Sequence, residues 1–124
     1  MNFVTNFLTL QNQLRVYHWQ TQKKPGSYAQ HIAFGTAYEE LEPLIDDFIE
    51  IYQGKKGALL AKGNFTIICQ NLKDDYVDFI DEFISYLQDN VASSLDSEKD
   101  TDLLNIRDEM MAILNQTKYR LNMM

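Results

Sequence analysis

Apolar side chains recur along this chain at intervals of three and four residues, the spacing of α-helices that are buried on one side. Residues 2–22 form the first such stretch and residues 27–54 the second, separated by a Lys-Lys-Pro-Gly turn at 23–26. The first helix is expected to bury Phe3, Phe7, Leu10, Leu14 and Tyr17. The second is expected to bury Phe34, Tyr38, Leu41, Ile45, Phe48 and Tyr52.

Local signals set the limits of the second helix. Ser27, followed three residues later by Gln30, forms a capping-box pattern at its start, and Gly54 is expected to end it. Pro43 lies within this stretch, and because proline has no backbone N–H to donate, it should bend the helix near Glu39. Since the apolar spacing continues in phase across Pro43, we predict one bent helix.

The second half of the chain predicts two more helices, one ending near residue 89 and one running from residue 98 to the C-terminus. The residues expected to face inward on the third are Ile68, Leu72, Tyr76, Phe79, Phe83 and Leu87. Those on the fourth are Leu103, Ile106, Met110, either Ile113 or Leu114, Thr117 and Leu121. Residues 90–97 form a polar linker, and strand-like alternation is absent from the sequence. We therefore predict an all-α fold, a four-helix bundle formed by residues 1–124 as a single domain.

The connection at residues 54–66 determines the topology of this bundle. Fully extended, its 13 residues reach about 43 Å, whereas a helix of about 24 residues is about 36 Å long. The connection could cross the whole bundle or form a loose hairpin, and the spacing alone permits both.

Composition narrows the classes of function. The chain has 124 residues and a net charge of -7, which argues against nucleic-acid binding and against attraction to anionic membranes. Its single cysteine, Cys69, cannot form an internal disulfide, and no apolar run approaches the ~18 residues of a membrane span. The N-terminus lacks the basic and small-residue pattern of a signal peptide. We expect a soluble, cytoplasmic protein.

Candidate chemistry is concentrated in the first half of the chain. Both histidines, His18 and His31, flank the turn, and Trp19 follows the first of them. On the second helix, a strip of four acidic residues is spaced three, four and four residues apart: Glu39, Glu42, Asp46 and Glu50. Imidazoles and carboxylates suit iron, manganese or zinc. The alternative interpretation is a solvated acidic face with locally hydrogen-bonded histidines, and an apolar anchor in Trp19.

These residues resemble the core motif of the Dps-like miniferritins. In that family a His-Trp pair ends the first helix, a second histidine opens the next helix, and an aspartate and a glutamate follow at intervals of fifteen and four residues. Here His31, Asp46 and Glu50 have those intervals, while the interval from His18 to His31 is one residue longer than usual. Gly35 stands where the family often has an acidic residue. The same stretch is similar to short ferritin-like proteins of phage and marine viral genomes.

The resemblance implies a ferritin-like bundle with a crossover between its second and third helices. It also implies a homodimer, which in the family assembles into a larger shell, with His18 and His31 facing Asp46 and Glu50 of a two-fold-related subunit. Iron would bind there and be oxidised, so the family activity is that of a ferroxidase, with Trp19 packed beside the site. The alternative from a different class is a metal-free helical bundle that acts as an interaction or structural protein of viral or phage type.

Overall fold

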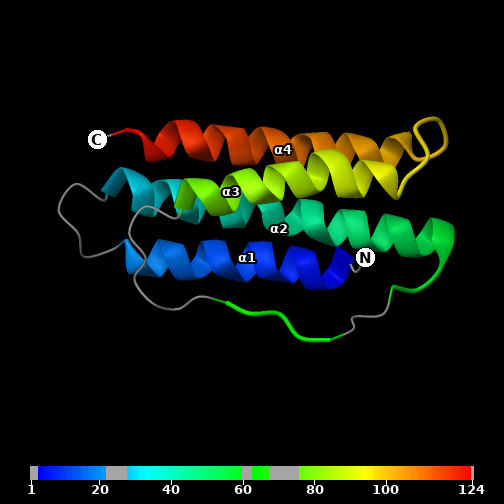
Figure 1. The fold of residues 1–124 in the computed structure, drawn as a ribbon, viewed down its shortest axis with the longest axis horizontal. Helices are drawn as coiled ribbons and strands as arrows, with labels where there is room; N and C mark the ends of the chain where they lie inside the picture. The colour runs from blue at the N-terminus through cyan, green and yellow to red at the C-terminus, as the bar shows by residue number, and fades with distance from the viewer. Residues whose placement is uncertain (1–2, 22–27, 60–62, 68–75, 124) are drawn as a thin grey trace.

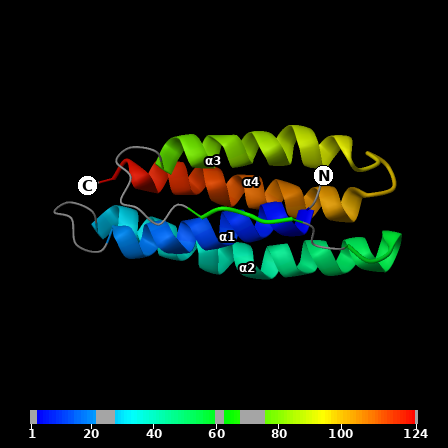
Figure 2. The ribbon, with the colours of Figure 1, turned by 60° about the horizontal axis from the view of Figure 1, so that its bottom comes forward.

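The computed structural model describes residues 3–21, 28–59, 63–67 and 76–123. Its helical elements in chain order are α1 (Phe3–Gln20), α2 (Tyr28–Lys56), α3 (Tyr76–Ser85), the π-helical continuation η1 (Tyr86–Val91) and α4 (Thr101–Leu121). The helices lie side by side with their long axes aligned (Figures 1 and 2). The described residues contain no strand, which confirms the all-α prediction. Among the described helices, none combines the length and apolar character that a membrane span requires.

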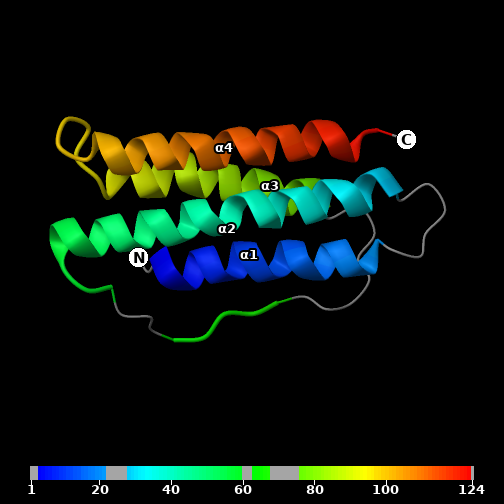
Figure 3. The same cartoon turned by 180° about the vertical axis from the view of Figure 1, so that it is seen from behind.

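The helices run in two directions. α1 and α4 run one way along the molecule, and α2 and α3 run the other way (Figures 1 and 3). One end of the molecule therefore holds the end of α1, the start of α2 and the C-terminal end of α4, and the other end holds the start of α4. Residues 63–67 run beside α1 in Figures 1 and 3 and across the front of it in Figure 2.

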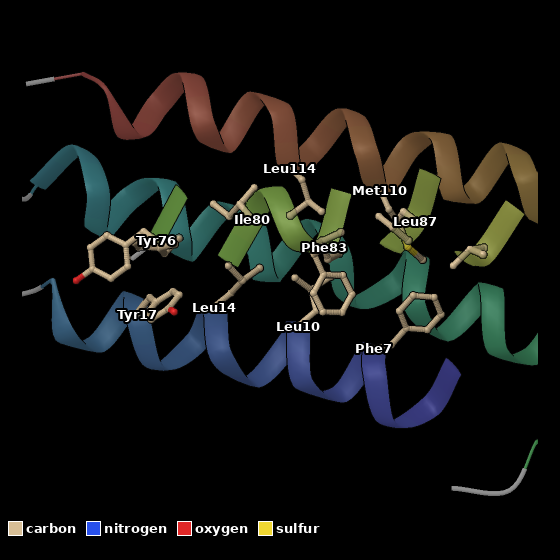
Figure 4. Close-up of a cluster of buried hydrophobic side chains, with 14 of the residues drawn as sticks. Phe7, Leu10, Leu14, Tyr17, Tyr76, Ile80, Phe83, Leu87, Met110 and Leu114 are labelled. Carbon is tan, nitrogen blue, oxygen red and sulfur yellow. The ribbon is translucent and has the colours of Figure 1, made fainter. Parts of the chain in front are cut away.

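The inward face of α1 is the one that the sequence predicts. All five expected residues of α1 are buried. Their rings meet those of α2 edge-on: the centroids of Phe7 and Phe48 are 5.2 Å apart, and those of Tyr17 and Phe34 are 5.3 Å apart in a tilted pair. Figure 4 shows the residues of α1 directed toward those of α3 and α4 in one continuous apolar core.

α2 continues as one helix through Pro43, whose side chain is exposed. It ends at Lys56 rather than at Gly54, and the residue after it, Gly57, has a φ of 95°. This left-handed conformation favours glycine, and the Gly57 N–H donates to the Gln53 carbonyl at 3.0 Å. Gly57 therefore ends the helix. The predicted cap residue Ser27 lies outside the described residues.

The inward face of α3 differs from the prediction. Its buried residues are Tyr76, Ile80 and Phe83, followed by Leu87 and Val91 of η1, while Phe79 is only half-buried. Leu87 and Val91 are four residues apart, a spacing that places both side chains on the same face of a helix. Residues 92 and 93 are also helical, so the prediction of a linker from residue 90 is wrong at its start. Ile68, Cys69 and Leu72 lie outside the described residues.

The inward face of α4 resolves the choice between Ile113 and Leu114. Leu114 is fully buried, whereas Ile113 and Ile106 are half-buried. Ahead of this helix, Asp100 is buried and bonded to both Lys56, at 2.7 Å, and Lys55, at 3.1 Å. These ion pairs join the C-terminal end of α2 to the start of α4.

Candidate functional site: a histidine pair between two helices

His18 and His31 meet face to face between α1 and α2. His18 belongs to the last turn of α1 and His31 to the first turn of α2. Their ring centroids are 3.9 Å apart, their planes differ by 17°, and both residues are half-buried. The two histidines that the sequence singled out are thus direct neighbours in the folded chain.

Hydrogen bonds between the two residues are reciprocal. Nδ1 of His18 lies 2.7 Å from the carbonyl oxygen of His31, and Nδ1 of His31 lies 2.7 Å from the carbonyl oxygen of His18. A carbonyl oxygen can only accept, so both Nδ1 atoms must carry the proton. In a neutral imidazole the lone pair then resides on Nε2. The backbone therefore selects the same tautomer for both rings.

Gly35 forms the surface of α2 against which the His18 ring lies. A Cβ atom built on Gly35 would be 2.8 Å from Cε1 of His18, a distance that real Cβ atoms essentially never show, and 3.0 Å from its Nδ1. Gly35 is buried in spite of having no side chain. The residue that departs from the miniferritin pattern is thus in contact with the first histidine of that pattern.

Tyr38, one turn after Gly35, also packs against the His18 ring. The two rings meet edge-on with centroids 5.6 Å apart. The guanidinium carbon of Arg15 lies 5.2 Å from the centroid of the Tyr38 ring, a cation–π distance. Gln11 donates to the Tyr38 carbonyl at 3.0 Å, which adds a further link between α1 and α2. His18 is therefore held by contacts on several sides.

The predicted carboxylates lie elsewhere on the same chain. Fifteen residues separate His31 from Asp46 along α2, or about 22 Å at a rise of about 1.5 Å per residue. All four residues of the acidic strip are exposed: Glu39, Glu42, Asp46 and Glu50. Within the described residues, no group of three or more His, Cys, Asp or Glu side chains is close enough to hold a metal ion. One chain thus presents a histidine pair and an acidic strip as two separate features.

Trp19 is not a buried anchor. Its side chain is 60% exposed in the single chain, next to the histidine pair in sequence. Tyr28 and Ile32, on the first turns of α2, are 78% and 44% exposed. Apolar side chains therefore surround the histidine end of α2, while acidic side chains cover its exposed face farther along.

Sequence reasoning identified both histidines but missed the residues that position them. Gly35 and Tyr38 contact His18, yet neither was considered part of the site. The available signal was a glycine in the interior of a long predicted helix, where it lowers helix stability and needs a packing reason.

One family matches this chain. Its description reads "Family of unknown function (DUF5856)", and it matches residues 18–121, which is most of the chain. The chain therefore belongs to that family. Neither a curated protein nor a solved structure matches the sequence. The matched range begins at His18 and includes the histidine pair, Gly35 and the whole acidic strip.

Proposed function

We propose that this member of the family binds ferrous iron, or a similar divalent metal such as manganese or zinc, between two copies of the chain. His18 and His31 of one copy supply imidazole nitrogens, and Asp46 and Glu50 of the second copy supply carboxylates. The proposal follows the Dps-like resemblance, in which iron is also oxidised and sequestered.

The reciprocal hydrogen bonds of the histidines carry this proposal. A histidine that binds a metal usually donates its other ring N–H to a carbonyl or carboxylate, which orients the ring and makes the free nitrogen a better ligand. Both His18 and His31 have this arrangement, with Nδ1–H on a backbone carbonyl and Nε2 left over. Neutral imidazole nitrogens are ligands that suit iron and zinc.

A second copy is needed because one chain cannot complete the ligand set. Asp46 lies about 22 Å from His31 along the same helix. A two-fold axis perpendicular to α2 would pair it antiparallel with α2 of a second copy, so that the histidine end of each faces the acidic strip of the other. This pairing would use exposed residues on both sides, including Trp19 and Ile32.

The course of the helices supports a ferritin-like arrangement. In that topology, the second and third helices run parallel and a long connection crosses between them. α2 and α3 run in the same direction here (Figure 1). We therefore propose the ferritin-like four-helix bundle, with its crossover, as the architecture that presents α1 and α2 to a second copy.

In the proposed reaction the iron is oxidised, and the side chains bind and orient it. Ferrous iron is the substrate, and each ion gives up one electron to peroxide or dioxygen that arrives from solution. The neutral imidazoles orient the ion without adding charge, and the two carboxylates balance its charge. Glu39 and Glu42 lie on the exposed strip beside Asp46 and raise the local concentration of cations.

A metal-free interaction or structural protein is the second candidate, and a specific observation favours it. Each histidine already donates a hydrogen bond to the backbone carbonyl of the other, so the pair joins α1 to α2 without a metal. The exposed Trp19 and Tyr28 beside it would then contact another protein.

Calorimetric titration with Fe²⁺ under anaerobic conditions distinguishes the two candidates. The wild-type protein should bind iron stoichiometrically, whereas His31→Asn and Glu50→Gln should each lose this binding. The asparagine amide can replace the Nδ1–H donor of His31 but offers no nitrogen ligand, so His31→Asn removes the ligand and keeps the hydrogen bond. Asp47→Asn is the matched control, because Asp47 is an exposed carboxylate of the same helix outside the proposed set.

Absence of iron binding in the wild-type protein would refute the metal function. A strictly monomeric protein in an equilibrium sedimentation experiment would refute the intersubunit site. Equal binding by wild type, His31→Asn and Glu50→Gln would show that the metal binds through other residues.

A further inference from the structure

We infer that Gly35 is a positioning residue for the histidine pair: its missing side chain makes the space in which the His18 imidazole adopts the tautomer and orientation that leave Nε2 available. The effect of Gly35 on metal binding rests on the proposed function. The coupling between Gly35 and His18 can be tested in the metal-free protein.

Glycine is required at this position because a side chain would have no room, and not because of its backbone conformation. Among the described glycines, only Gly57 and Gly63 have positive φ angles, so Gly35 has a conformation that any residue can adopt. Gly35 lies in the interior of α2, where glycine is the least favourable helix residue apart from proline. Any other residue except proline would strengthen the helix locally. The loss of helix stability caused by glycine is offset only if the absence of a side chain permits a favourable contact.

That contact is with His18. The three nearest atoms to a Cβ built on Gly35 all belong to the His18 ring, at 2.8 Å for Cε1, 3.0 Å for Nδ1 and 3.6 Å for Nε2. By comparison, a Cβ built on Gly54 of the same helix has nothing within 4 Å. Gly35 therefore accommodates one specific side chain.

The ring cannot move aside freely to admit a methyl group. His18 donates through Nδ1 to the His31 carbonyl at 2.7 Å and stacks on the His31 ring. Tyr38 lies edge-on against it. Because Nδ1 is itself among the atoms that the Cβ would crowd, a shift of the ring weakens the hydrogen bond that selects the tautomer. A side chain at position 35 would thus act on the metal site through His18.

The experiment compares Gly35→Ala with Gly54→Ala, which is the same substitution in the same helix without a crowded neighbour. Two properties are measured on each: the imidazole ¹⁵N chemical shifts of the metal-free protein, which report the tautomer, and the affinity for Fe²⁺ under anaerobic conditions. Gly54→Ala should change neither property. Gly35→Ala should alter the His18 ¹⁵N pattern and lower the iron affinity by about 10- to 100-fold, the usual effect of disturbing a group that orients a ligand.

A double-mutant cycle with His18→Ala supplies a readout that does not depend on metal. When His18 is removed, the crowding is removed with it, so Gly35→Ala should then stabilise the protein against urea, as alanine does in place of glycine in a helix interior. In the presence of His18, Gly35→Ala should stabilise it less or destabilise it.

Two results would overturn the inference: an unchanged His18 ¹⁵N pattern in Gly35→Ala, or the same stability change from Gly35→Ala with and without His18. If the wild-type protein binds no iron, the proposed function fails, whereas the ¹⁵N measurement and the cycle still decide whether Gly35 positions His18.

Discussion

His18 and His31 stack with ring centroids 3.9 Å apart, and each donates its Nδ1–H to the carbonyl oxygen of the other. The His18 carbonyl is one of the last four of α1, which have no hydrogen-bond donor within their own helix. His31 supplies that donor, and Thr21 Oγ1 adds a second at 3.1 Å. The pair therefore caps the end of α1 and joins it to the start of α2. The same bonds orient two free ring nitrogens.

Removing the His18 ring should destabilise the protein. His18→Ala should lower the free energy of unfolding by about 1–2 kcal/mol, because it eliminates one hydrogen bond and leaves His31 without its stacking partner. His31→Asn should cost less, since its amide can still donate to the His18 carbonyl. Urea unfolding followed by circular dichroism measures both changes. Equal losses for the two variants would show that the reciprocal bond adds little to stability.

The packing of α4 predicts unequal effects from two adjacent residues. Leu114→Ala should lower the free energy of unfolding by about 2–5 kcal/mol, because Leu114 is fully buried and its truncation leaves a cavity. Ile113→Ala should cost about 1 kcal/mol, since Ile113 is half-buried and its site stays in contact with water. Thermal unfolding of the two variants provides the comparison. A larger loss for Ile113→Ala would contradict the placement of α4.

Stability at acid pH should depend on Asp100. The backbone N–H of Asp96 and the ammonium group of Lys56 hold the pKa of the Asp100 carboxyl well below its ordinary value of 3.8. Because folding lowers this pKa, the charged carboxylate stabilises the folded state fully above pH 3.8. This contribution is lost as the pH falls from there through the lowered pKa.

Asp100→Asn should therefore be less stable than wild type at neutral pH, and its stability should decline less steeply below about pH 4. Asp102→Asn is the control, because Asp102 pairs with Lys55 but its side chain is 49% exposed, so its effect should be smaller. Urea unfolding at a series of pH values gives both curves. Parallel curves for wild type and Asp100→Asn would rule out this role of Asp100.

Trp19 should matter for association rather than for folding. Its 60% exposure predicts that Trp19→Ala changes the free energy of unfolding of the single chain by no more than about 0.5 kcal/mol. If Trp19 lies at the contact between two copies, the same variant should raise the dimer dissociation constant by at least about tenfold. Tyr119→Ala, which removes an exposed aromatic side chain from α4, should leave association unchanged. Equal dissociation constants for wild type and Trp19→Ala would place Trp19 outside the contact.

The sequence predicted helices well where one apolar stripe was unambiguous. The stripe of α1 runs from Phe3 to Tyr17 without a competing face, and all of its residues are buried. On the third helix, Phe79 and Ile80 are adjacent and belong to different stripes, so the periodicity could not decide between them. Val91 was missed because the polar residues beside it predict a linker from residue 90, whereas the helix continues through residue 93.

The candidate site could be predicted only as a set of residue types. The spacing of His18 and His31 about a turn suggested that they lie close together, and they do. Their reciprocal bonds and the space at Gly35 arise where α1 meets α2, so no pattern within one helix could show them. Asp46 and Glu50 are exposed and distant from the histidines in one chain, and their proposed role depends on a second copy.

Mixing two inactive variants tests the central claim most directly. His31→Asn and Glu50→Gln should each bind no iron as separate homodimers. After the two are unfolded together and refolded at equal concentrations, half of the dimers pair one chain of each kind, and one of the two sites in such a dimer has all its ligands. Anaerobic Fe²⁺ titration of the mixture should therefore recover about a quarter of the wild-type capacity. No recovery from a mixture that refolds and dimerises as the wild type does would contradict a site shared between two copies.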